Sequence, residues 1–379
     1  MTSKERVRTV LEGRIPDRVP TAEFAVDFDT VERIVGHETY FRAKARSQIA
    51  FWEGRHDEVA ESYTKDHIEL QKKLDLDIVT FSMATSHIPR PTDDPPPRKI
   101  DHNTWEDKYG RVYKYSETTA DITCVRNPVA DARRYSVADF EGEIGPPKRD
   151  ERSWAILDAV IREFKDEKFI CGASGGEVGT VLPGGIERGS LVLLTQPEVV
   201  RAATRRALEY ANRADEVLVH PDQDGVLWGA DFGFKTGPFV SPRHFEEFYL
   251  EANKARVQAL HDRGQWVLKH CCGNLWALLD FFVEIGYDCY QSIQHTASMD
   301  ICEVKKRYGD RMTLWGGVSL ENLQSGTPDD VRSDVRRAME CAKPGGRFIL
   351  GSSHSIAVGT KYDNYMAMLD EYHKSADYH

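Results

Sequence analysis

Long apolar runs and clusters of basic residues are both missing from this chain of 379 residues. No stretch approaches the ~18 apolar residues that a membrane-spanning helix needs. No Lys/Arg-rich run of the kind found in nucleic-acid-binding proteins occurs, and the formal net charge of −11 disfavours binding to phosphate backbones. The opening residues MTSKERVRTVLEGRIPDRVP lack the apolar centre of a signal peptide, so we expect a cytoplasmic protein.

The cysteine pattern also argues against a disulfide scaffold. The chain has seven cysteines, an odd number, and two of them, Cys271 and Cys272, are adjacent. Without a secretion signal, paired thiols are not expected, and clustered thiols suggest metal binding or catalysis. We interpret the other five as small buried apolar residues; they are Cys124, Cys171, Cys289, Cys302 and Cys341.

Eight short apolar or β-branched runs recur along the chain, and an amphipathic segment follows each of them. The runs cover residues 18–24, 76–83, 168–175, 225–233, 266–273, 287–294, 311–319 and 347–354. Nearly continuous hydrophobicity is typical of strands that are buried on both faces. The alternation predicts an α/β fold, a (β/α)₈ TIM barrel. An open doubly wound sheet is the alternative, but no G-x-G-x-x-G follows the first strand.

One insertion interrupts the pattern between the second and third strands. It begins with the Pro-rich loop PRPTDDPPPRK, and the alternation in TWEDKYGRVYKYS predicts a β-hairpin after it. We expect a single barrel domain over residues 1–379, with an N-terminal extension and with residues 84–150 as a cap over the barrel mouth.

The candidate metal ligands lie at the ends of two predicted strands. Chemistry in such barrels sits at the C-terminal ends of the strands, where strand five ends in His270, Cys271 and Cys272 and strand eight ends near His354. Residues two apart on a strand share a face, so His270 and Cys272 point the same way and Cys271 points into the strand–helix layer. Zinc takes such N and S ligands. We predict His270, Cys272 and His354 as its three protein ligands, with hydrogen-bonded mouth histidines as the simpler alternative.

Other strand ends supply candidates for catalysis and substrate binding. Asp231, His295 and Glu177 could act as catalytic groups or orient the metal ligands. A substrate pocket could be formed by an acid and several apolar side chains, although core packing is the ordinary role of the latter. The candidate substrate-binding residues are Glu23, Phe24, Phe81, Met83, Trp228 and Phe232.

Several motifs together resemble the uroporphyrinogen decarboxylase superfamily, in particular its corrinoid-dependent methyltransferase branch. They are ERVRTVLEGRIPDRVP, DFGFKTGPFVSPRHFEEF, LKHCCGN, KKRYGDRMTLWGGVS and GGRFILGSSHSI, with YDN leading into the last helix. The resemblance covers most of the chain, is weaker from about residue 84 to 165, and implies the same barrel. Decarboxylases of the superfamily carry an Arg-rich N-terminal motif, and this chain has TAEFAVDFD in that region.

The resemblance also implies a zinc site and a partner. The methyltransferase branch has H-x-C-G on strand five, matched by His270 and Cys272, and a cysteine on strand eight, where this chain has His354. Zinc with two imidazoles and one thiolate has a charge of +1, which suits polarisation of an ether oxygen better than a neutral site. The resemblance therefore favours an O-demethylase that passes a methyl group, for example from a methoxylated aromatic, to a Co(I) corrinoid. The corrinoid must come on a partner protein, because D-x-H-x-x-G is absent.

Three alternatives to the O-demethylase stay open at this point. They are a decarboxylase of the uroporphyrinogen decarboxylase type, a methylcorrinoid:thiol methyltransferase, and a non-catalytic protein that binds a corrinoid protein or a small ligand. The sequence does not identify the methyl donor, and a homodimer is left open.

Overall fold

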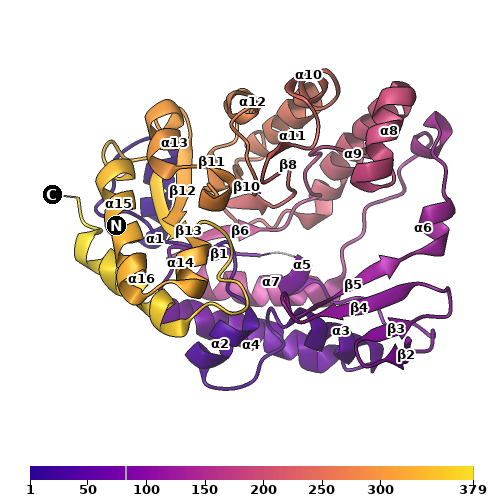
Figure 1. Ribbon diagram of the computed structural model, residues 1–379, viewed down its shortest axis with the longest axis horizontal. Helices are drawn as coiled ribbons and strands as arrows, with labels where there is room; N and C mark the ends of the chain where they lie inside the picture. The colour runs from indigo at the N-terminus through magenta and orange to yellow at the C-terminus, as the bar shows by residue number, and fades with distance from the viewer. Residues whose placement is uncertain (82, 379) are drawn as a thin grey trace.

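The central element is a parallel sheet of seven strands, surrounded by helices (Figure 1). The computed structural model describes residues 1–81 and 83–378, with the side chains of residues 83 and 84 outside the described part. In spatial order the strands are β1 (Ile78–Thr80), β6 (Phe169–Gly172), β7 (Gly225–Trp228), β10 (Trp266–Cys271), β11 (Cys289–Ser292), β12 (Thr313–Val318) and β13 (Phe348–Ser352). Each lies inside a run predicted as a strand.

The eighth predicted strand, residues 18–24, is an extended segment rather than a full strand, and we call it the N-terminal stave. It lies between the first and last strands of the sheet: Ala22 N donates to Leu350 O on β13 at 3.0 Å, and Asp77 N donates to Thr21 O at 2.8 Å. These bonds close the sheet on itself. The predicted barrel is therefore confirmed, with an eighth position that is held by isolated bridges.

The barrel interior is filled by inward-facing side chains, as in a packed core. One hydrophobic cluster takes at least one residue from every strand position: Ala22, Ile78, Phe169, Cys171, Leu227, Leu268, Cys289, Trp315 and Ile349. The same cluster includes Val7, Val10 and Leu11 of helix α1 (Ser3–Leu11). The N-terminal extension thus closes the bottom of the barrel.

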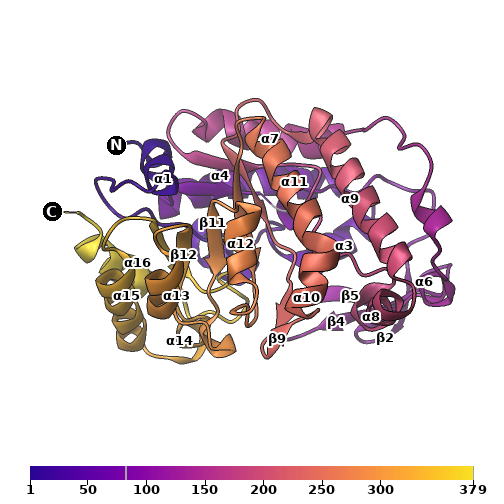
Figure 2. The ribbon, with the colours of Figure 1, turned by 90° about the horizontal axis from the view of Figure 1, so that it is seen from above.

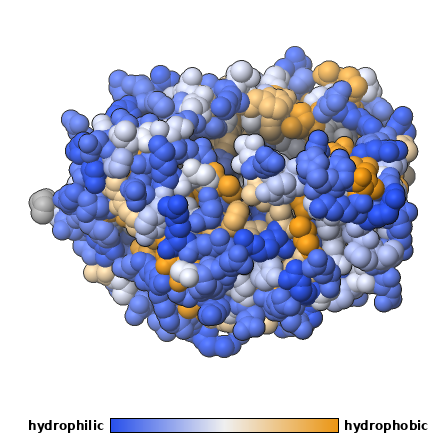
Figure 3. Space-filling view, turned by 60° about the horizontal axis from the view of Figure 1, so that its bottom comes forward, coloured by the Kyte–Doolittle hydropathy of each residue, from blue (hydrophilic) through white to orange (hydrophobic). Residues whose placement is uncertain are grey.

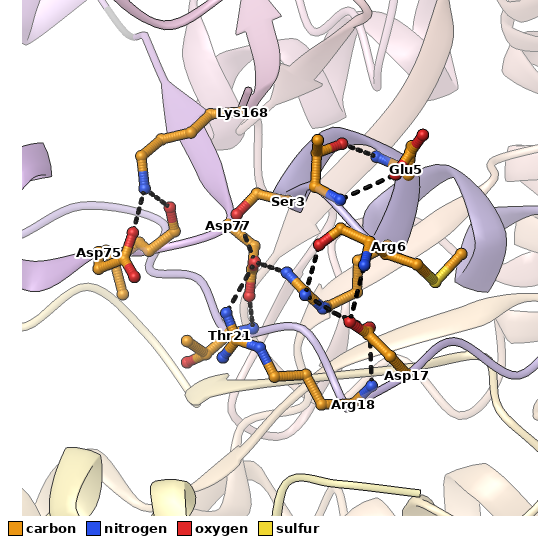
Figure 4. Close-up of polar contacts among 12 residues, drawn as sticks. Ser3, Glu5, Arg6, Asp17, Arg18, Thr21, Asp75, Asp77 and Lys168 are labelled. Carbon is orange, nitrogen blue, oxygen red and sulfur yellow. Dashed lines mark hydrogen bonds and ion pairs between the residues drawn. The ribbon is translucent and has the colours of Figure 1, made fainter. Parts of the chain in front are cut away.

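A buried carboxylate fixes α1 in this position. Asp77 is fully buried and accepts hydrogen bonds from Arg6 Nη1 and Ser3 Oγ, both at 2.7 Å, and from Thr21 N at 2.8 Å (Figure 4). Asp17 forms a second ion pair with Arg6, at 2.8 Å. Figure 2 places α1 on one side of the sheet, while β9 (Gly237–Pro238) and α14 (Leu320–Ser325), which follow the C-terminal ends of strands, lie on the opposite side. The mouth is therefore on the side away from α1.

The helices begin and end where local sequence signals predict. Thr327 forms a capping box with Asp330, and Pro328 starts α15. The helical segment that follows Ser241 consists of α10 (Pro242–Phe245), a π-helical turn η2 (Glu246–Leu250) and α11 (Glu251–His261). The remaining helices that surround the barrel are α2 (Phe28–Val35), α3 (Lys44–Trp52), α4 (His56–Leu74), α7 (Glu151–Phe164), α8 (Gly185–Thr195), α9 (Pro197–Leu218), α12 (Leu279–Ile285), α13 (Ile301–Tyr308), α14 (Leu320–Ser325), α15 (Pro328–Ala342) and α16 (Tyr362–Ser375).

The insertion forms an antiparallel sheet of four strands: β2 (Arg98–Asp101), β3 (Thr104–Glu106), β4 (Val112–Ser116) and β5 (Asp121–Arg126). The predicted hairpin is its β3–β4 pair, in register at Trp105 and Tyr113. Both of these rings contact Trp52 of α3, at centroid distances of 5.7 and 5.5 Å. Figures 1 and 2 show the sheet beside α3, on the side that carries β9 and α14. The insertion stands beside the mouth, and a role as its cap stays a prediction.

Short elements complete the chain: α5 (Met83–Ser86), α6 (Pro128–Ala132), η1 (Val137–Phe140), the β8 (Gly233–Phe234) and β9 (Gly237–Pro238) pair, and η3 (His295–Ala297). Among the described residues, no helix is both long and apolar enough to cross a membrane.

The burial and pairing of the cysteines differ in part from the prediction. Cys171 and Cys289 are buried in the barrel interior, as expected. The interpretation is wrong for three others. Cys124 is exposed on β5, and Cys302 on α13 forms a disulfide with Cys341 on α15. The two helices pack side by side, which brings thiols 39 residues apart within bonding distance.

Candidate metal centre

Three side chains that could ligate a metal converge at the mouth of the barrel. The ligand atoms of His270, Cys272 and His354 all lie within 4.8 Å of one another. The first two come from the end of β10 and the third from the residues that follow β13. The surface is hollowed between hydrophobic and polar residues in the upper half of the view in Figure 3.

The alternation of β10 explains why one thiol joins this group and the other does not. Cys272 Sγ lies 3.3 Å from His270 Nε2. Cys271 is fully buried in the helix layer, where its sulfur accepts a hydrogen bond from Phe232 N at 3.1 Å. The two adjacent thiols therefore face opposite sides of the sheet.

The ring of His270 is held on two sides. Its Nδ1 is hydrogen-bonded to Gln291 Oε1, and the ring of Phe24 stacks on it with centroids 3.9 Å apart. Burial lowers the pKa of His270 to about 3, so the imidazole is neutral at pH 7. A neutral ring whose Nδ1 is occupied presents the lone pair of Nε2 as the ligand atom.

His354 and Cys272 also have the chemistry of ligands. Ser355 Oγ lies 2.9 Å from His354 Nδ1, which leaves Nε2 of that ring available. Burial lowers the pKa of His354, although nearby Asp231 and Asp27 oppose the shift. Burial raises the pKa of Cys272 to about 12, and the charge of Asp231 adds to the effect. Such a thiol stays protonated until a cation beside it stabilises the thiolate.

This donor set fits a zinc ion. Two imidazole nitrogens and one sulfur are ligands that zinc accepts, and three protein ligands are usual where one coordination position serves chemistry. A second group, His37, Asp66 and Glu69, is also close enough to hold a metal. There the Asp66 oxygens already accept bonds from His37 and Thr39, and Glu69 pairs with Lys73 at 3.0 Å. We interpret this second group as a packing contact between α4 and the turn that follows α2.

Asp231 and His295 lie at the mouth, as predicted. Asp231 is exposed, and its Oδ1 accepts a hydrogen bond from Cys272 N at 2.8 Å. It thereby holds the backbone of a candidate ligand. His295 is exposed at the start of η3, directly after β11. Their catalytic roles stay predictions.

Glu177 is engaged elsewhere. Its Oε2 lies 2.6 Å from Lys269 Nζ, and its Oε1 accepts a bond from Ala230 N at 2.6 Å. Lys269 is fully buried and points out of the barrel, since it alternates with His270 along β10. A buried ammonium needs a partner charge. Glu177 is the counter-ion of Lys269, and its role as a catalytic group stays a prediction.

Most of the predicted substrate pocket is core. Trp228 packs outward, where its Nε1 donates to Ser174 Oγ at 3.0 Å, and Phe232 is fully buried beside Phe245. Phe81 lies in the cluster beneath α7. All three side chains are buried in hydrophobic core clusters, and their roles in substrate binding stay predictions.

The other three residues predicted to line the substrate pocket differ in where they lie. Phe24 is half-buried at the mouth against His270. Glu23 faces the helix layer, is 2% exposed, and accepts a hydrogen bond from Ser352 N at 3.2 Å. The side chain of Met83 lies outside the described residues. Substrate binding by Phe24 stays a prediction.

The sequence interpretation missed Gln291 of the site, and it missed Lys269, the buried partner of Glu177. Gln291 is the β11 residue opposite His270 in the register of the two strands. Its signal was available in the run YDCYQSIQ, where a glutamine interrupts a buried strand. Lys269 had a similar signal, as a charged residue inside the apolar run WVLKHCC.

Residues 226–375 match the uroporphyrinogen decarboxylase (URO-D) family. The resemblance inferred from sequence motifs is thereby confirmed at the level of this family. All three candidate ligands lie inside the URO-D region, and the insertion lies outside it. None of the curated proteins matches this chain.

A solved structure shares the fold over almost the whole length. A methyltransferase from Methanosarcina mazei superposes with a TM-score of 0.66, 16% sequence identity, and coverage of 99% of both chains. At this identity the likeness establishes the shared fold. A Xaa-Pro dipeptidase with bound methionine in the active site aligns over 59% of this chain and 58% of its own, with 15% identity and a TM-score of 0.30, and carries no argument.

Proposed function

We propose that this protein is a zinc-dependent O-demethylase. It would move a methyl group from an O-methyl compound, in the simplest case a methoxylated aromatic, to the Co(I) corrinoid of a partner protein in the cytoplasm. The observation that carries the proposal is the convergence of His270, Cys272 and His354 at the mouth, with Nδ1 of each imidazole hydrogen-bonded to a residue outside this group. The fold shared with a methyltransferase from Methanosarcina mazei is consistent with it.

The composition of the donor set favours methyl donation from an ether. When bound, zinc supplies a Lewis acid that stabilises negative charge on the leaving oxygen. Two neutral rings and one thiolate leave such a site with a charge of +1, whereas two thiolates would neutralise it. The second imidazole, His354, is thus the residue that distinguishes ether cleavage from thiol methylation in this proposal.

The transfer balances without a further redox reagent. The ether C–O bond breaks with its electron pair remaining on oxygen, and the methyl carbon bonds to cobalt through the electron pair of Co(I). The released phenolate then takes a proton. We assign the proton donor as His295, because it is exposed at the mouth directly after β11.

The test combines metal analysis with a single-turnover assay. The purified protein should contain about one zinc per chain, and it should convert a reduced corrinoid protein and a methoxylated aromatic into methylcobalt and a phenol. His354→Ala should lose both zinc and activity, and His373→Ala, at an exposed histidine of α16, is the matched control. Zinc that is undiminished in His354→Ala and Cys272→Ala would refute the ligand assignment.

A decarboxylase is the second candidate, because the matching family is named for uroporphyrinogen decarboxylase. The segment that leads into the mouth opposes it. In place of several arginines for porphyrin carboxylates, residues 21–29 carry the acids Glu23, Asp27 and Asp29, and Asp27 is already paired with Arg42 at 2.6 Å. Loss of a carboxyl group from uroporphyrinogen by metal-free protein would favour the decarboxylase over the O-demethylase.

A further inference from the structure

Gln291 occupies a position from which it controls the ring of His270. The two residues are register partners on β11 and β10, and Gln291 is fully buried. Its Nε2 donates to the backbone carbonyl of Ser352 at 3.2 Å. A carbonyl can only accept, so this bond fixes which end of the amide is the NH₂ group.

The orientation of the amide determines the tautomer of the histidine. With Nε2 directed at Ser352, Gln291 presents Oε1 to His270 Nδ1. An amide oxygen can only accept, so Nδ1 carries the proton and Nε2 carries the lone pair. That lone pair faces Cys272 Sγ at 3.3 Å. The ligand atom is therefore set before any metal binds.

The same contact ties the two ligand-bearing strands together. Ser352, whose carbonyl accepts from Gln291, is the last residue of β13 and precedes His354 by two positions. Gln291 thus spans from His270 to the strand end that carries the third ligand. Phe24 fixes the plane of the ring from the opposite direction, at an interplanar angle of 15°.

We propose that Gln291 is a positioning residue that holds His270 for zinc and keeps the zinc site electron-poor. Histidines that bind metals often donate their second N–H to a carboxylate, which makes the ring a stronger donor and adds negative charge. Gln291 makes the same hydrogen bond with a neutral amide. The bond then orients the ring without reducing the +1 charge of the site. This inference rests on the proposed function for its electronic part, and on geometry alone for its positioning part.

Two substitutions separate these parts. Gln291→Met keeps the side-chain length and removes the hydrogen bond, so zinc should bind about 10- to 100-fold more weakly. Gln291→Glu keeps an acceptor and adds charge, so zinc should bind at least as tightly as in the wild type. Ether cleavage per bound zinc should nevertheless fall about tenfold or more in Gln291→Glu.

The control uses a buried glutamine next to β10, the strand of His270, at the end away from the mouth. Gln265 directly precedes β10, is 8% exposed, and accepts a bond from Gln223 Nε2 at 2.9 Å. Gln265→Met and Gln265→Glu make the same chemical changes far from the mouth and should leave zinc affinity unchanged. Affinity is measured by competition with a chromophoric chelator. Nitrogen-15 shifts of the His270 ring in the zinc-free wild type should show the proton on Nδ1, a readout that needs no variant.

The outcomes distinguish this inference from the proposed function. Wild-type zinc affinity in Gln291→Met, or a proton on Nε2 in the wild type, would overturn the positioning role. Full ether cleavage by Gln291→Glu would overturn the electronic role. If the zinc affinities follow the expected order but the wild type cleaves no ether, the demethylase proposal is wrong and the positioning role stands.

Discussion

Phe24 stacks on His270 with ring centroids 3.9 Å apart and an angle of 15° between the planes. The first comes from the N-terminal stave and the second from β10, so the stack joins opposite sides of the mouth. Gly229 allows this contact, because a Cβ at that position would lie only 3.2 Å from the Phe24 ring.

Removing the stack should weaken the metal site without abolishing it. Aromatic pairs contribute about 1 kcal/mol beyond area burial, so Phe24→Ala should bind zinc roughly fivefold more weakly. Phe24→Tyr keeps the ring and should match the wild type in chelator competition. Equal affinities in all three proteins would show that the stack does not support the ligand.

The two adjacent cysteines should differ sharply in metal binding. Cys272→Ser should lose most of the zinc, since it removes the sulfur beside His270. Cys271→Ser should retain about one zinc per chain, because that thiol lies in the helix layer. Elemental analysis of the purified variants is sufficient. A loss in Cys271→Ser as large as that in Cys272→Ser would contradict the strand register.

Exchanging one ligand tests the role of charge. His354→Cys should retain zinc while the site becomes neutral. We expect ether cleavage to fall by ~10²-fold or more, the order of effect for losing a well-placed electrostatic stabiliser. The measurement is the rate of methylcobalt formation per bound zinc. A variant that keeps zinc and the full rate would leave zinc only a positioning role.

Glu23 should make stability depend on pH. Burial raises the pKa of Glu23 to about 8, although hydrogen bonds from Ser352 oppose the shift. A carboxyl group ionises near pH 4.3 in an unfolded chain. Between that value and about 8 the folded state therefore holds the extra proton, and stability falls as the pH rises.

Glu23→Gln should remove this dependence. From pH 5 to pH 9 the wild type should lose on the order of a few kcal/mol more unfolding free energy than the variant. Urea denaturation at several pH values measures the difference. Parallel curves for the two proteins would mean that Glu23 is ionised in the folded state.

The disulfide should stabilise the protein only under oxidising conditions. Closing a loop with a sequence separation of 39 contributes about 4 kcal/mol in the chain-entropy treatment. Cys302→Ser should therefore unfold at lower urea than the wild type without reductant, and at the same urea concentration with reductant present. If the two proteins differ by the same urea midpoint with and without reductant, the loss of stability in Cys302→Ser comes from packing and not from the disulfide.

The strands were predictable because burial on both faces gives continuous apolar runs, and seven of the eight runs contain a strand. Residues 18–24 were predicted as a full strand, but only isolated bridges form there. The hydrophobic pattern of a segment indicates that it is buried. It does not indicate how many backbone hydrogen bonds the segment makes, because that number depends on how closely the neighbouring segments approach it. The pairing of Cys302 with Cys341 was missed for a related reason, since spacing along the chain does not reveal which helices pack together.

At the candidate site, strand alternation was sufficient to separate Cys271 from Cys272. It did not identify the partners of side chains on other strands. Glu177 was assigned to catalysis because it follows a strand end, yet Lys269 on β10 binds it. Gln291 is visible in the sequence as a glutamine inside a buried strand, but its contact with His270 depends on the register between β11 and β10, which spacing along the chain does not give.

The N-terminal stave has a consequence for synthesis of the protein on the ribosome. This segment emerges early, but Thr21 donates to Leu350 O, 329 positions later in the chain. Until β13 has been made, the barrel has an open seam, Phe24 has no fixed place, and His354 is absent. Nascent chains therefore carry His270 and Cys272 as an incomplete pair. For the proposed zinc site, metal capture would therefore be a late event that coincides with closure of the barrel.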